Sequence, residues 1–124
     1  MREVIIIISV IALVVAGSML MQRYLEQTSD ELISILEEIK SDIENLEKTK
    51  TLSEELLAKW NEINKVWSTI IIHEELDNIE LSMLGLKGAI ISGDSDDATE
   101  EIERTIFLVG HIKEKEAFKL KNIF

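Results

Sequence analysis

The residues best suited to chemistry lie in one short segment, residues 73–80, with the sequence HEELDNIE. This segment differs from the metal-binding pattern H-E-x-x-H in that Asp77 replaces the second histidine. On a helix, His73 and Asp77 would share a face and offer two metal ligands, with Glu74 in the position of a general base. A third ligand would have to be His111 or a distant acid. We favour the alternative, a polar helix junction with satisfied hydrogen bonds, and therefore expect no metal ion, no cofactor and no catalytic residue.

Two tryptophans are the other conspicuous side chains. Trp60 and Trp67 are seven residues apart, so a helix would place both rings on one face, two turns apart. Packing in a hydrophobic core is the favoured interpretation, and a hot spot for a protein partner is the alternative. The candidate residues for an interaction surface or polar site are therefore Trp60, Trp67, His73, Glu74, Asp77 and His111.

The composition argues against several classes of protein. The chain has 124 residues, with 24 acidic and 13 basic side chains and a formal net charge of −11. Because it has no cysteine, it has no disulfide framework, zinc–thiolate site or thiol nucleophile. The acidic balance argues against a nucleic-acid partner, which needs a basic surface. The absence of proline and the five glycines predict long helices rather than a turn-rich β fold.

The apolar residues gather near the N-terminus. Residues 4–21 carry no charge, and as a helix they would extend about 27 Å, close to the roughly 30 Å of bilayer hydrocarbon. Arg2 precedes this segment and Arg23 follows it. We therefore predict a short tail at residues 1–3, a transmembrane anchor at residues 4–21 and an acidic domain at residues 22–124.

A cleaved signal peptide is the main alternative for the apolar segment. Ala16, Gly17 and Ser18 offer small residues for a cleavage site. However, the basic region before the segment is weak, and the apolar run continues beyond that site. A buried core helix is a third interpretation. For a retained single-pass anchor, we expect a cytoplasmic N-terminal tail and an extracytoplasmic C-terminal domain, because a short tail usually stays inside.

Residues 22–124 predict an all-α domain, an antiparallel bundle of three to four helices. Its apolar residues recur in alternating steps of four and three, the spacing of helices that bury one face. The first face contains Leu25, Ser29, Leu32, Leu36, Ile39, Ile43 and Leu46, and the second contains Leu56, Trp60, Ile63, Trp67 and Ile70. The third contains Ile79, Met83, Leu86 and Ile90, and the fourth contains Ile102, Ile106, Phe107 and Val109.

The linkers between these helices are predicted from turn and capping signals. Residues 48–50 would separate the first two helices, and Thr51 with Glu54 would form a capping box for the second. The apolar face changes register near His73, so we expect a break, a kink or a buried polar site there. Gly93 suits the end of the third helix, and the residues after it suit the next N-cap. The tail is expected to pack on the bundle through Phe118, Leu120, Ile123 and Phe124.

The sequence as a whole resembles a known family, domain of unknown function 4363, small single-span helical membrane proteins of Clostridia and related Gram-positive bacteria. The matching features are the N-terminal isoleucine-rich span, residues 28–32, Lys59, Trp60, Trp67, residues 73–80 and residues 111–116. The family often has proline where this chain has Lys113. The resemblance implies one membrane span and a helical domain, and it implies no activity. It draws attention to the matching positions His73, Glu74, Asp77 and His111.

These observations predict a membrane-anchored helical interaction or accessory protein of the cell envelope rather than an enzyme. The expected partners are the lipid bilayer and a protein of the membrane or envelope, and no nucleic acid. The alternative is a metal- or ligand-sensing module with its site at His73 and Asp77. A homo-oligomeric scaffold is a third hypothesis.

Overall fold

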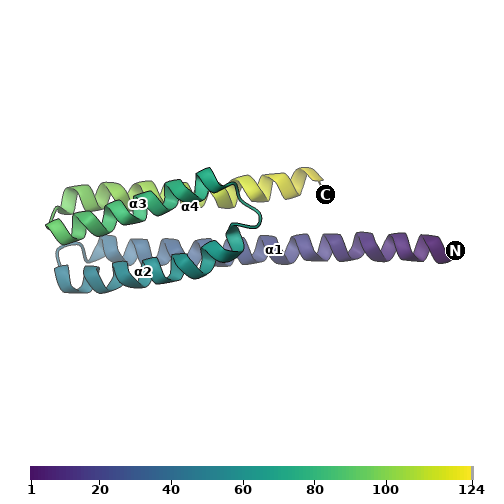
Figure 1. The fold of residues 1–124 in the computed structure, drawn as a ribbon, viewed down its shortest axis with the longest axis horizontal. Helices are drawn as coiled ribbons and strands as arrows, with labels where there is room; N and C mark the ends of the chain where they lie inside the picture. Colours follow the sequence, from purple (N-terminus) through teal and green to yellow (C-terminus); the bar gives the residue numbers. More distant parts are fainter. Residues whose placement is uncertain (124) are drawn as a thin grey trace.

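The computed structural model describes residues 1–123, which form four α-helices (Figure 1). The helices are α1 (Arg2–Ser41), α2 (Leu46–Trp67), α3 (His73–Ser92) and α4 (Ser95–Ile123). The predicted all-α fold, a long apolar N-terminal helix followed by a helical bundle, is confirmed.

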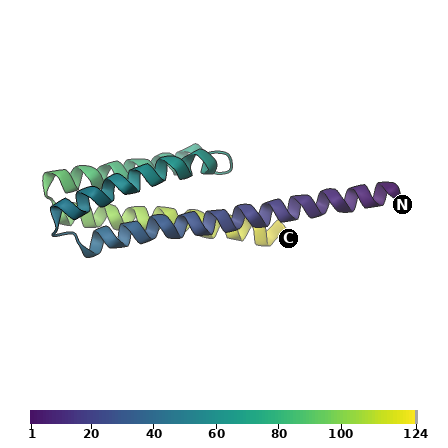
Figure 2. The ribbon, with the colours of Figure 1, turned by 90° about the horizontal axis from the view of Figure 1, so that it is seen from below.

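The helices run alternately up and down around a shared core (Figures 1 and 2). α1 packs against α2 and α4, and α3 also packs against α2 and α4. The loops at residues 42–45 and 93–94 define the distal end of the bundle, and the loop at residues 68–72 defines its proximal end. The first half of α1 projects beyond the proximal end, and α4 runs past the α2–α3 loop beside it (Figure 1).

The core is built from the apolar faces that the sequence predicts. On α1 the buried face begins at Leu25 and continues to Ile39, as one unbroken helix. The other predicted residues that are buried are Leu56, Trp60, Ile63, Trp67, Ile79, Met83, Leu86, Ile90, Ile102 and Val109. Each large apolar side chain buried in this way stabilises the fold by roughly 1.5–3 kcal/mol. Leu46 and Ile70 are exposed, because they lie at the start of α2 and in the loop after it.

The loop between α1 and α2 lies earlier in the chain than predicted. α1 ends at Ser41, and residues 48–50 lie within α2 rather than in a linker. The N-cap of α2 is Asn45, whose side-chain oxygen accepts a hydrogen bond from the backbone N–H of Lys48 at 3.2 Å. An asparagine in this position satisfies one of the free N–H groups at the start of a helix.

The capping box predicted at Thr51 and Glu54 is therefore wrong. Thr51 lies more than a turn into α2, and its hydroxyl donates to the carbonyl of Glu47 at 3.1 Å. The earlier start of the helix allows Thr49 and Leu52 to be buried against the core. Tertiary packing thus selects one of two capping signals that lie six residues apart.

The break predicted near His73 is confirmed, since α2 ends at Trp67 and α3 begins at His73. After Trp67, the hydroxyls of Ser68 and Thr69 donate to backbone carbonyls three residues earlier, at 3.1 and 2.7 Å. Such bonds compete with continuation of the helix. Residues 70–72 are three consecutive isoleucines, whose β-branched side chains have a low helix propensity.

The turn predicted between α3 and α4 is also confirmed. Gly93 has a φ of 76°, the left-handed conformation that glycine adopts without a steric penalty. The next residue, Asp94, caps α4 by accepting a hydrogen bond from the backbone N–H of Asp97 at 3.0 Å.

Phe107 does not face inward as predicted, because its side chain is 69% exposed. The buried line of α4 runs through Ile102, Thr105 and Val109. At about 100° per residue, Phe107 points nearly opposite to Thr105.

The predicted packing of the C-terminal tail holds only in part. Leu120 is half-buried and lines grooves beside α1, but Phe118 is exposed. The predicted contacts of Ile123 and Phe124 involve side chains outside the described part of the structure.

Replacing Trp60 by alanine should lower the free energy of unfolding by about 3–5 kcal/mol, because the ring is fully buried and its removal leaves a cavity. The matched control is Phe107→Ala, which removes an exposed ring and should change stability by less than about 0.5 kcal/mol. Denaturant unfolding of the full chain in detergent, followed by circular dichroism, measures both. Equal losses for the two variants would contradict the core position of Trp60.

Candidate functional site

The polar segment at residues 73–80 forms the first turns of α3. His73, Glu74 and Asp77 are all exposed to solvent. The N-cap residue is Ile72, which makes no side-chain hydrogen bond. Acidic side chains in the first turn lie near the positive end of the helix dipole, so this position stabilises their negative charge.

His111 lies on α4 and is also exposed. Its ring stacks on that of Phe107, with the centroids 6.0 Å apart. Within residues 1–123, no group of three or more His, Asp or Glu side chains is arranged to hold a metal ion. The described residues therefore do not bring His111 or a further acid to His73 and Asp77 as a metal-binding cluster.

Glu75 of this segment links α3 to α4 through an ion pair. Its Oε1 lies 2.8 Å from Nζ of Lys115, and this hydrogen bond raises the pKa of Lys115. A second contact joins Lys113 to Asp30 of α1 at 2.9 Å, and it raises the pKa of Lys113 in the same way. Both contacts are partly exposed to solvent, and they link α4 to α1 and to α3 at the surface of the bundle.

The two tryptophans lie inside the bundle. Their ring centroids are 5.8 Å apart and their planes are nearly perpendicular, the edge-to-face arrangement that aromatic rings favour. The indole N–H of Trp67 donates to Oγ1 of Thr28 at 3.0 Å, and that hydroxyl donates to the carbonyl of Tyr24 at 2.7 Å. Trp60 and Trp67 are both fully buried, so their rings hold α1 and α2 together and present no surface to a partner.

Sequence reasoning missed an apolar stripe on the outer side of α3. Leu81, Leu84 and Ile91 are 66%, 50% and 64% exposed, and with Gly88 they recur in steps of three and four. We call these four residues the α3 stripe. A helix with this spacing presents a continuous apolar line, here distinct from the buried line of the same helix.

The surroundings of the α3 stripe gave a signal in the sequence that could have identified it. Residues 81–93 contain one charged residue, Lys87, although 30% of the whole chain is charged. The side chains of Leu81, Leu108 and Arg104 line a neighbouring cleft of about 300 Å³ between α3 and α4. Exposed apolar residues that form a contiguous line, rather than lying singly, are typical of surfaces that bind another protein or a membrane.

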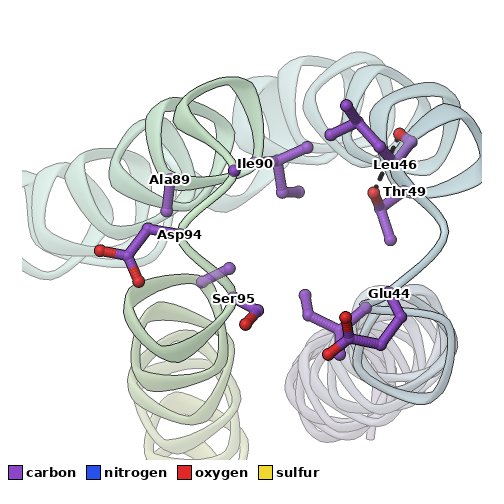
Figure 3. Close-up of a pocket in the computed structure, with 10 residues that line it drawn as sticks. Glu44, Leu46, Thr49, Ala89, Ile90, Asp94 and Ser95 are labelled. Atoms are coloured by element: carbon purple, nitrogen blue, oxygen red, sulfur yellow. Dashed lines mark hydrogen bonds between the residues drawn. The ribbon is translucent and has the colours of Figure 1, made fainter.

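A small cavity of about 140 Å³ lies at the distal end, between the two loops there (Figure 3). Figure 3 shows Glu44 and Asp94 on different sides of it, with Ser95 between them. The carboxylate of Asp94 already caps α4. Pockets for small molecules usually have volumes of about 300–1,000 Å³, so we assign no ligand to this cavity.

Thr28→Val should lower the free energy of unfolding by about 1–3 kcal/mol, because it leaves the buried indole N–H of Trp67 without an acceptor. The adjacent Ser29→Ala is the control: Oγ of Ser29 is buried and makes no hydrogen bond to the described residues. Its removal should be neutral or stabilising. Unfolding curves for both variants test this contrast, and a larger loss for Ser29→Ala would refute it.

Comparison with known protein families identifies the family of this chain. The family model described as Domain of unknown function (DUF4363) matches residues 19–123, which include the whole bundle and the end of the apolar segment. No curated protein and no solved structure matches the chain. Because the match covers most of the sequence, the chain belongs to the DUF4363 family.

Proposed function

We propose that residues 4–21 of α1 anchor this protein in the cell membrane and that its bundle, outside the cytoplasm, binds a protein of the envelope. In this proposal the protein is an interaction or accessory protein without catalytic activity. The first half of α1 supports an anchor: it is long and apolar enough to cross a bilayer, and its 18-residue apolar window is 0% buried within the molecule. A signal sequence has the same two properties.

The continuity of α1 supports retention of this segment. The backbone forms one helix from Arg2 to Ser41. Residues 13–22 line two grooves together with the last turns of α4. Cleavage near Ser18 would remove much of the surface beside which Leu120 is half-buried.

The α3 stripe is the observation that favours a protein partner. The bundle that carries it is strongly acidic: residues 31–64 and 78–110 together carry sixteen acidic and six basic side chains. A complementary partner is an amphipathic helix with an apolar seam flanked by basic residues. The seam would cover the stripe, and the basic flanks would be attracted by the net negative charge of the bundle.

The anchor and its orientation can be tested with a reporter enzyme that is active only outside the cytoplasm. Fused after Phe124, the reporter should be active, and the full-length protein should remain in the membrane fraction. An inactive reporter would contradict the orientation. A soluble, shortened product would contradict the anchor and support cleavage near Ser18.

The partner surface can be tested with two synthetic helical peptides that share a leucine seam, one with lysine flanks and one with glutamate flanks. The full chain in lipid nanodiscs should bind the lysine peptide at least tenfold more tightly, as measured by fluorescence anisotropy. Leu84→Asp should weaken this binding at least tenfold, because it places a charge in the stripe.

Ser34→Asp is the matched control for this experiment. It adds the same charge at an exposed position on α1, which packs against α2 and α4 rather than α3. Binding should be unchanged. Equal affinity for the two peptides, or equal weakening by both variants, would refute the proposed surface. If each nanodisc holds two copies of the chain, and Leu84→Asp reduces this number to one, then the surface binds a second copy of the chain instead of another protein.

A further inference from the structure

The last two turns of α4 lie beside the apolar half of α1. α4 passes the α2–α3 loop and continues along α1 toward the N-terminus (Figures 1 and 2). Glu116, Lys119 and Leu120 line a groove of about 470 Å³ whose other wall is formed by α1 between residues 13 and 25. The end of α4 therefore accompanies the segment proposed to enter the membrane.

The depth of this contact follows from helix geometry. Leu120 lines this groove and also a second one, whose α1 wall is formed by Val15, Met19 and Gln22, so it lies alongside the C-terminal part of the apolar segment. Met21 marks the expected edge of the hydrocarbon, and the headgroup region extends about 5–8 Å beyond it toward the bundle. If residues 4–21 cross the bilayer, the end of α4 lies below the water boundary.

We propose, on the basis of the membrane anchor described above, that the proximal end of the bundle is seated in the outer part of the bilayer. The last two turns of α4 and the α2–α3 loop contact phospholipid there. A lipid acyl chain fills the groove between α1 and α4.

The side chains at the end of α4 suit this position. Phe118 is 67% exposed, and the neighbouring Ala117 is exposed as well. Lys119 forms an ion pair with Glu116 at 3.3 Å, which offsets two charges near the apolar region. Lys119 and Lys121 have stems long enough to raise their ammonium groups to the headgroups. Exposed aromatic residues beside lysines are typical of interfacial helices.

The α2–α3 loop presents apolar side chains at the same end of the molecule. Ile71 is buried and holds the loop to the core, whereas Ile70 and Ile72 are exposed. Ile70 lines the groove together with Leu120. Transfer of these two exposed isoleucines from water to lipid is favourable, because it removes apolar surface from water.

The charge distribution favours the same orientation. The proximal part, residues 22–30, 65–77 and 111–124, carries seven acidic and six basic side chains. The rest of the bundle therefore holds nearly all of the net charge of −11. An anionic lipid surface repels carboxylates, so the nearly neutral proximal end is the one that can approach it.

Single-cysteine variants provide the test, because the chain has no native cysteine. Full-length Ile72→Cys and Phe118→Cys, labelled with a small fluorophore, are reconstituted in vesicles of phosphatidylcholine and phosphatidylglycerol. The vesicles carry lipid-bound quenchers placed near the headgroup or deep in the acyl chain. Ile11→Cys reports on the anchor, and Ile91→Cys at the distal end is the matched exposed control.

The shallow quencher should reduce the fluorescence of labels at positions 72 and 118 severalfold more than that of the label at position 91. Neither quencher should reduce the fluorescence of the label at position 91. The label at position 11 should respond to the deep quencher. If the label at position 11 is quenched but the label at 72 or 118 is not, the proposed contact of the proximal end with phospholipid is refuted. The membrane anchor is then still supported. If position 11 is bright in both vesicles, the anchor itself is wrong. Quenching at position 91 would also overturn the proposal, because the bundle would then lie flat on the lipid.

Discussion

The molecule depends on α1 remaining one rigid helix while its surroundings change along its length. Residues 4–14 are exposed on all sides, whereas from Leu25 onward one face of the same helix is buried in the bundle. Because the backbone hydrogen bonds continue without a break, no flexible linker separates the apolar segment from the bundle. The hydrogen bond from the indole N–H of Trp67 to Thr28 joins α2 to α1 close to the start of the buried face of α1. The direction of α1 therefore fixes the direction of the whole bundle.

The unequal lengths of the helices determine what lies at the proximal end. α3 has 20 residues and α4 has 29, and the two meet at the tight turn of Gly93 and Asp94. The greater length of α4 corresponds to about 14 Å of helix, so the C-terminal end of α4 must project beyond α3. The contacts of Lys113 with Asp30 and of Lys115 with Glu75 hold α4 against its neighbours just before this projection begins. The C-terminal turns therefore follow α1 rather than turning back over the bundle.

The buried faces could be predicted from the sequence because a helix that buries one face has apolar residues spaced three and four positions apart. Leu32, Leu36 and Ile39 were identified in this way, and so was the change of register at His73. The start of α2 could not be predicted, since Asn45 and Thr51 are both acceptable caps and only the burial of Thr49 and Leu52 distinguishes them.

The α3 stripe was missed for a related reason. α3 carries two apolar lines, one through Ile79, Met83 and Leu86 and the other through Leu81, Leu84 and Ile91. Periodicity alone cannot tell which line meets the core, because that depends on where α2 and α4 lie. The exposed line and the acidic residues of the bundle would act on a partner over different distances. Carboxylates attract a basic helix over about a Debye length of 8–10 Å, and apolar contact acts only once water is expelled. The rate of encounter and the stability of the proposed complex thus depend on different residues of the bundle.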